Sequence, residues 1–266
     1  MIEMRILYVI ALSGCLATLL LWLGAMRIVS RKLAGALAFC SLALGGGLLA
    51  LAVFPGNSFY GPVIAQVKTQ EKVIALTFDD GPYTPYTEQL LQVLKEEKVQ
   101  ATFFIVGENA EKYPQLVKQV QNDGHEIALH SYVHKDQLKL TEAEVAANLA
   151  QGKAALEKIT GVPVKLFRPP HGFKDWTVMA EIEKAQLKAV NWSIIPRDWT
   201  NPGTEVIASR VIEKAEPGAI VLLHDGDSPS YKAPREQTVQ ATGKIIRELR
   251  KQGYRFVTIS ELLNNN

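Results

Sequence analysis

The sequence predicts an α/β protein, in which a barrel or strongly curved parallel sheet follows an N-terminal hairpin of two apolar helices. Two uncharged apolar stretches fill most of residues 1–54, and seven short runs rich in β-branched and aromatic residues then alternate with amphipathic stretches over residues 73–259. Such alternation needs crossover connections and therefore favours parallel pairing of the strands. No Gly-x-Gly-x-x-Gly follows the first run, which favours a barrel over an open doubly wound sheet.

Each apolar stretch is long enough to cross a bilayer as a helix. Residues 6–26 and 33–54 carry no charge, and about 20 apolar residues suffice for a span. The loop between them holds three basic residues, against one in the N-terminal tail, so the positive-inside tendency places that loop in the cytoplasm. We therefore expect residues 1–54 to anchor the chain in a lipid bilayer by two spans. A linker at 55–70 would join them to a domain at 71–266 outside the cytoplasmic membrane.

A cleaved signal peptide followed by a buried helix is the alternative interpretation of this segment. The first apolar stretch is longer than the usual signal core of about 7–15 residues and lacks an Ala-x-Ala-like site. Residues Leu12–Cys15 resemble a lipoprotein cleavage box, but the apolar run continues beyond Cys15. These features favour a span, although they leave open whether the first stretch is retained or cleaved.

Charge and cysteine usage narrow the choice of partners. Residues 1–54 hold four of the 29 basic and one of the 27 acidic residues, so the remainder is near neutral and has no basic stripe for nucleic acid. No obligate protein partner is evident. Both cysteines, Cys15 and Cys40, lie in the apolar stretches. A metal bound by the domain would therefore need His, Asp or Glu ligands.

The elements of the domain are predicted from residue type and from terminal signals. Thr84 and Pro85 are typical of a helix start, and Gly124, Gly161 and Gly253 follow amphipathic stretches as helix-ending glycines do. The expected strands are 73–78, 102–106, 126–129, 164–167, 187–193, 220–223 and 255–259. The expected helices begin near residue 85 and then cover 113–121, 141–159, 174–185, 204–215 and 237–252.

Polar residues gather at the ends of these expected strands. In α/β barrels the carboxyl ends of the strands share one face, where catalysis takes place. Five of the seven expected strands are followed by such residues, which predicts one polar mouth. They are Asp79 and Asp80 after the first strand, His130 and His134 after the third, Arg168 after the fourth, Asp198 shortly after the fifth and His224 with Asp225 after the sixth.

Two of these patterns together indicate a metal site. His130 and His134 are four residues apart, a spacing that puts both imidazoles on one side of a helical turn. With one carboxylate they would leave an open position for water, as catalytic zinc requires. One of the adjacent Asp79 and Asp80 can bind the metal while the other takes a proton from its water. Taken singly, the patterns also fit hydrogen-bonded histidines and a solvated Asp-Gly-Pro turn.

Five motifs of the sequence resemble those of the polysaccharide deacetylase family, the NodB-homology or carbohydrate esterase 4 domain. They are TFDDGP, HSYVH, FRPPHG, RDW and LLHD, in this order, and the resemblance covers roughly residues 70–262. The family implies a distorted (β/α)7 barrel that removes acetyl groups from N-acetylated sugars. It also implies a divalent metal bound by Asp, His and His, usually zinc, with Co²⁺ or Mn²⁺ as alternatives.

The resemblance also implies a role for each matching residue. Asp79 would be the general base, held ionised and oriented by Arg168, and Asp80, His130 and His134 would be the metal ligands. His224 would be the general acid, tuned by Asp198. Trp199 and Leu222 would line the pocket for the acetyl methyl group, and the backbone N–H of His171 would bind the oxyanion. The family often has an aromatic residue at position 171; a histidine there keeps the backbone donor.

We therefore expect a membrane-anchored N-deacetylase whose partner is an N-acetylated glycan polymer, peptidoglycan or poly-N-acetylglucosamine. An amidase of the same fold acting on a small non-sugar amide is one alternative, and a catalytically silent carbohydrate-binding membrane protein is another. We expect His125 to pack near the site and Trp176 and Trp192 to be core or rim residues. The segment 227–235 is expected to form a loop beside the mouth.

Overall fold

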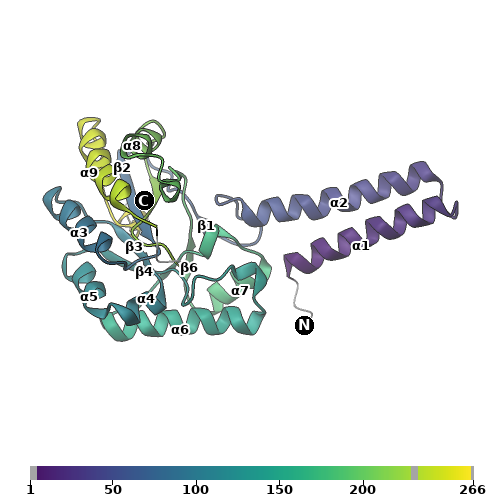
Figure 1. Cartoon of the computed structure of the whole chain (residues 1–266), viewed down its shortest axis with the longest axis horizontal. Helices are drawn as coiled ribbons and strands as arrows, with labels where there is room; N and C mark the ends of the chain where they lie inside the picture. Colours follow the sequence, from purple (N-terminus) through teal and green to yellow (C-terminus); the bar gives the residue numbers. More distant parts are fainter. Residues whose placement is uncertain (1–4, 229–232, 265–266) are drawn as a thin grey trace.

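A curled parallel sheet covered by helices forms the main body of the molecule, and a two-helix hairpin projects away from it (Figure 1). The computed structural model describes residues 5–228 and 233–264. The described strands are β1 (Val63–Ile64), β2 (Val73–Asp79), β3 (Thr102–Ile105), β4 (Glu126–Leu129), β5 (Leu166–Phe167), β6 (Lys188–Val190), β7 (Ala219–His224) and β8 (Arg255–Phe256).

Helices connect successive strands and cover the outside of the sheet (Figure 1). The described helices are α1 (Ile6–Ala25), α2 (Arg31–Val53), α3 (Tyr86–Glu96), α4 (Gly107–Lys112), α5 (Pro114–Asn122), α6 (Glu142–Thr160), α7 (Trp176–Lys184), α8 (Thr204–Ile212), α9 (Glu236–Lys251) and α10 (Ile259–Asn264). Three single 3₁₀ turns lie at Gln137–Lys139, Pro170–Gly172 and Asp198–Thr200.

The sheet is a distorted barrel, as predicted. Its order is β1-β6-β5-β4-β3-β2-β7 with β8 against β2, and every strand pair is parallel. The gap between β6 and β7 closes through an isolated parallel bridge between Ile194 and Val221, supported by a hydrogen bond from the Leu222 N–H to the Ile194 carbonyl of 2.9 Å. A second isolated bridge, antiparallel, joins Gln66 to Ala219 of β7. Isolated bridges in place of a full ladder explain the distortion.

The two faces of the strands build two separate hydrophobic clusters. Along β2, Ile74, Leu76 and Phe78 pack outward against the helices, whereas Val73 and Ala75 pack inward. This is the two-residue period of a strand. Continuing that period places Thr77 and Asp79 on the inner face, so the interior is apolar at the amino ends of the strands and polar at their carboxyl ends. At the apolar end, Ile259 and Leu262 of α10 belong to the inner cluster.

The element boundaries differ from the sequence expectation in places. The fourth, fifth and seventh strands are shorter than expected, and β1, α4 and α10 were not expected. Thr84 does not cap α3: the residue before the helix is Pro85, and the Thr84 hydroxyl donates to Glu88 at 2.5 Å. The predicted helix ends at Gly124, Gly161 and Gly253 are correct, since all three have positive φ. Residues 229–232 of the expected mouth loop lie outside the described residues.

The hairpin packs α1 against α2 through small residues. Ser41 donates a hydrogen bond to the Ser13 carbonyl at 3.0 Å, and a Cβ added at Gly24 would lie 2.7 Å from the Ala34 Cβ. Small residues let apolar helices approach closely. Both helices are long and apolar enough to cross a membrane, a test that a signal sequence near the N-terminus also passes.

We predict that Gly218→Ala destabilises the fold strongly. Gly218 has a φ of +75° and a Cβ placed there would lie 1.8 Å from the Val67 carbonyl oxygen. Gly161→Ala is the matched control, because its φ is +70° and a Cβ there meets nothing within 4 Å. The control should cost about 1–2 kcal/mol for the left-handed backbone, and Gly218→Ala about 1–3 kcal/mol more for overpacking. Equal losses in the apparent thermal midpoint would contradict this account.

Candidate active site

The predicted catalytic and ligand side chains converge at the carboxyl ends of the strands. β2 and β7 pair in a register that sets Asp79 directly opposite His224. The His130 N–H bonds to Ile105 at the end of β3, and the Arg168 N–H bonds to Leu129 at the end of β4. The Asp79, His130 and His224 side chains therefore line one mouth, a cavity of about 400 Å³, whereas the fully buried Arg168 is connected to it through its contact with Asp79. Its walls also include His171, Phe173, Trp192, Ile195, Trp199, Leu222 and Arg235.

Asp79 is held by a buried ion pair with Arg168. The two side chains are 2.5 Å apart, and both are at most 3% exposed. The guanidinium donates further to the Thr77 hydroxyl and to the Val190 and Asn191 carbonyls, so its orientation is fixed. Burial raises the pKa of Asp79 to about 6, against the lowering effect of Arg168. This carboxylate is thus positioned, and its pKa lies close enough to neutrality for proton transfer.

Asp80, His130 and His134 form a group that can hold a metal ion. One ligand atom from each residue lies within 4.8 Å of the others. Asp80 Oδ1 lies 3.5 Å from His130 Nε2 and 3.1 Å from His134 Nε2. Burial holds the pKa of His130 well below its usual value and lowers that of His134 to about 4. Both imidazoles are therefore neutral near pH 7, the form that binds metals.

Two observations show that this group fits a cation. The His130 Nδ1 lies 2.7 Å from the Arg168 carbonyl, which must accept the Nδ1 proton, so the lone pair on Nε2 faces Asp80. Among the described residues, the buried Asp80 Oδ1 has no hydrogen-bond partner, and burial raises the pKa of Asp80. The Asp80 Oδ1 and the His130 Nε2 lone pair face one another without a proton between them and repel, whereas a divalent cation between them would be attracted to both.

The loop between the two histidines is not helical, which corrects the sequence expectation. Residues 130–134 form no helix, and positive φ angles at Ser131 and His134 turn the chain instead. The two imidazole rings nevertheless lie 4.9 Å apart between centroids. A tight loop and a helical turn both bring residues four apart onto one side, so the spacing alone did not distinguish them.

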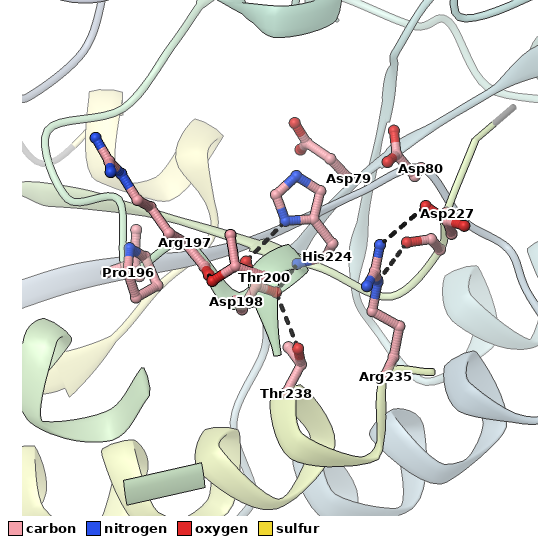
Figure 2. Close-up of polar contacts among 12 residues, drawn as sticks. Asp79, Asp80, Pro196, Arg197, Asp198, Thr200, His224, Asp227, Arg235 and Thr238 are labelled. Atoms are coloured by element: carbon pink, nitrogen blue, oxygen red, sulfur yellow. Dashed lines mark hydrogen bonds and ion pairs between the residues drawn. The ribbon is translucent and has the colours of Figure 1, made fainter. Parts of the chain in front are cut away.

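His224 is held between Asp198 and the two adjacent carboxylates, as Figure 2 shows. Asp198 accepts from His224 Nδ1 and from the His224 backbone N–H, both at 2.9 Å, and from the Thr238 hydroxyl at 2.9 Å. Burial lowers the pKa of His224, but the charge and hydrogen bond of Asp198 outweigh it and raise this pKa to about 9. His224 is therefore an imidazolium near neutral pH, able to donate a proton.

The remaining predicted residues also line the mouth. Leu222 is buried, and the exposed Trp199 ring lies 5.2 Å from the His224 ring. His171 has a φ of 61° within a 3₁₀ turn, and its ring contacts His134 at 5.2 Å. Trp192 is a buried residue of the rim, as expected.

Sequence reasoning missed the supporting polar residues and misplaced one histidine. Thr77, Asn191 and Thr238 contact the predicted catalytic groups or their partners. The available signal was the polar Asn191 inside the expected strand 187–193. His125 does not lie near the site. It precedes the first residue of β4, at the opposite end of the sheet, where its Nδ1 accepts from the Ala101 N–H at 3.2 Å.

This fold and mouth define a class of α/β-barrel hydrolase with catalytic groups at the carboxyl ends of parallel strands. Residues 66–190 match the family model described as polysaccharide deacetylase. The chain is 45% identical over 205 residues to a peptidoglycan-N-acetylglucosamine deacetylase of Bacillus cereus, covering 76% of this chain and 93% of that protein. It is 37% identical over 198 residues to a chitooligosaccharide deacetylase of a Bradyrhizobium species, covering 71% and 90%.

A solved structure gives the same result. The Bc1960 peptidoglycan N-acetylglucosamine deacetylase superimposes with a TM-score of 0.71 at 32% identity, covering 75% of this chain and 92% of that one. The chain therefore belongs to the polysaccharide deacetylase family, and it is a hydrolase of N-acetyl amide bonds.

We predict that Asp198→Asn lowers the pKa of His224. The carboxylate is the main group that raises this pKa to about 9, so the pKa should fall when its charge is removed, because burial then opposes only the charges of Asp79 and Asp80. Thr238→Val is the control, because it removes one hydrogen bond from Asp198 and leaves the charge. The His224 ring would be titrated by NMR in chelator-treated protein. An unchanged titration in Asp198→Asn would refute the assignment.

Proposed function

We propose that the protein is a membrane-anchored, metal-dependent N-deacetylase of a cell-wall or surface glycan, peptidoglycan or poly-N-acetylglucosamine. The observation that carries this proposal is the mouth itself. A carboxylate held by an arginine, an imidazolium held by a carboxylate, and three candidate metal ligands surround one cavity. These are the groups that hydrolysis of an unactivated amide requires.

Asp80, His130 and His134 would hold the metal. Two nitrogens and one oxygen with an open side are typical of catalytic zinc, and Co²⁺ or Mn²⁺ would accept the same donors. When bound, the metal would lower the pKa of water and polarise the acetyl carbonyl. Zinc is our preferred identity.

Asp79 would act as general base. It lies next to Asp80 in the chain, and its Oδ2 is 3.7 Å from His130 Nε2, so it faces the same point as the ligands. Arg168 restricts its other oxygen. Asp79 would accept the proton of the attacking water, and the ion pair would keep the carboxylate in place throughout.

His224 would act as general acid. The leaving amine nitrogen must take up a proton, and the imidazolium paired with Asp198 can supply it. The backbone N–H of His171 would donate to the oxyanion, as preorganised donors do in acyl transfer. Trp199 and Leu222 would enclose the acetyl methyl group beside His224.

The hairpin would anchor the enzyme in the cytoplasmic membrane, with the catalytic domain at 71–266 outside. Only 11% and 17% of the apolar windows of α1 and α2 are buried within the molecule, and large side chains such as Leu12, Trp22 and Phe39 are exposed. A core helix would be mostly covered, whereas a bilayer would cover these residues. The basic loop at 27–32 would face the cytoplasm.

We expect the purified protein to release acetate from peptidoglycan, N-acetylglucosamine oligomers or poly-N-acetylglucosamine. A chelator should abolish this release and Zn²⁺ should restore it, because the proposed reaction needs a metal ion held by Asp80, His130 and His134. Acetate measured enzymatically with each substrate would also rank the polymers. Release from small non-sugar amides alone would favour the amidase alternative, and release that a chelator leaves unchanged would refute metal dependence.

Two variants should separate catalysis from metal binding. Asp79→Asn keeps the size of the side chain and all three ligands, so it should retain bound zinc and lose at least about 10²-fold in kcat. His130→Ala removes a ligand and should lose the zinc itself. Metal content by mass spectrometry and acetate release would be measured on both. Full activity in Asp79→Asn, or stoichiometric zinc in His130→Ala, would show the assigned roles to be wrong.

A further inference from the structure

The base of the hairpin is bound to the loop that forms the mouth. Lys174 and Asp175 follow the FRPPHG motif after one intervening residue, Phe173, and contact both helices of the hairpin. Asp175 Oδ2 accepts from the Ile6 N–H at 3.2 Å, at the start of α1, and the carboxylate lies 3.3 Å from the buried Arg5. Lys174 Nζ donates to the Phe54 carbonyl at 2.7 Å, at the end of α2. An anion thus meets a helix N-terminus and a cation a helix C-terminus, as the helix dipoles favour.

These contacts are built into the domain. Lys174 and Asp175 are fully buried, and burial lowers the pKa of Lys174 to about 8. The Lys174 backbone N–H also donates to the Ala52 carbonyl at 3.0 Å. A buried ammonium that lost these acceptors would be left uncompensated, so the hairpin and the catalytic domain are held in a fixed relation.

One side chain joins the end of α2 to the mouth. Asn191 Nδ2 donates to the Pro55 carbonyl at 2.9 Å and to the Gly172 carbonyl at 3.2 Å. Trp192 and Ile195 line the mouth on one side and, on the other, a second cavity of about 420 Å³ walled by Phe54, Pro55 and Gly56. The rim of the mouth is therefore one layer of side chains away from the end of the hairpin.

The hairpin has the length of a membrane span. The 23 residues of α2 rise about 34 Å, against about 30 Å for the hydrocarbon core. Phe54 and Phe59 follow α2 and are 64% and 53% exposed, and Phe59 packs on Tyr60 and Trp176. Aromatic side chains gather at membrane interfaces, and the headgroup layer adds only about 5–8 Å on each side. A spanning hairpin would thus hold the rim at headgroup level.

We propose that the substrate is an N-acetylated glycan carried on a lipid in the same leaflet, with the target sugar close to the membrane surface. This inference rests on the proposed function and names its substrate class. A flexible tether would let the domain search a thick polymer, whereas this docking confines the mouth to the membrane surface. A lipid-carried sugar is confined to the same layer, which raises its effective concentration at the mouth.

The test uses the full chain reconstituted in vesicles of phosphatidylethanolamine and phosphatidylglycerol. The probes are one short N-acetylglucosamine oligomer in three forms: joined directly to a phospholipid, joined through a polyethylene glycol spacer of about 30 Å, and free in solution. At equal bulk concentration the wild type should release acetate from the directly joined oligomer at least about tenfold faster than from the free one.

A lifted variant provides the comparison. It carries Arg5→Met and Lys174→Met and a rigid helical insert of about 20 residues after Val53, which adds about 30 Å. It should release acetate from the free oligomer at the wild-type rate and from the directly joined probe at least about tenfold more slowly than the wild type does. It should also act faster on the spaced probe than on the directly joined one. The double substitution without the insert is the control. It should keep the preference for the directly joined probe, because the chain that connects α2 to the catalytic domain keeps its short length.

The outcomes separate this inference from the function on which it rests. Equal rates on free and directly joined oligomers in the wild type, or an unchanged preference in the lifted variant, would overturn the inference while leaving a deacetylase. A wild type that prefers mature, insoluble polymer over every lipid-carried probe would overturn it too. Absence of acetate from every substrate would overturn the proposed function itself.

Discussion

The structure depends on one electrostatic constraint: Asp79 and Asp80, adjacent in the chain, are both buried at the end of β2. Burial raises the pKa of each carboxyl, so the fold must supply positive charge to keep them ionised. Arg168 supplies it to Asp79 through a fully buried ion pair. The charges of His224 and Arg235 lower the pKa of Asp80 in part, but the side chains that lie against it are two neutral imidazoles, which can bind a cation but cannot replace one. The predicted base and the candidate metal ligands thus share a single requirement for charge compensation.

The parallel sheet brings these groups together. Because side chains alternate along a strand, the same inner face that carries Val73 and Ala75 at one end carries Asp79 at the other, and the register of β2 with β7 sets His224 beside it. For His224 the charges are reversed: the buried carboxylate of Asp198 raises the pKa of the imidazole and keeps it protonated. The predicted base and the predicted acid therefore lie on neighbouring strands, each stabilised in its charged state by a different buried partner.

The loop after β5 connects the mouth to the two-helix hairpin. Its first residues form the turn at His171 beside the ligands, and its last two, Lys174 and Asp175, bind the two ends of the hairpin. Asn191 joins the Gly172 carbonyl of this turn to the chain just after α2. The contacts between the hairpin and the domain therefore lie within a few residues of the mouth, and they fix the position of the mouth relative to the hairpin.

The sequence by itself determined the α/β class, the parallel alternation and the charged and histidine residues of the mouth at the strand ends, because strand period and residue type are local. It could not place short elements such as β1 or α10, whose two to six residues are stabilised by partners distant in the chain. It suggested a helical turn for His130 and His134, and only the tertiary structure showed a loop. The supporting contacts of Thr77, Thr238 and Asn191, and the docking of Lys174 and Asp175 on the hairpin, were likewise decided by tertiary structure. Each of these contacts joins residues far apart in the sequence, and a local sequence pattern does not indicate which distant polar group a buried side chain will contact.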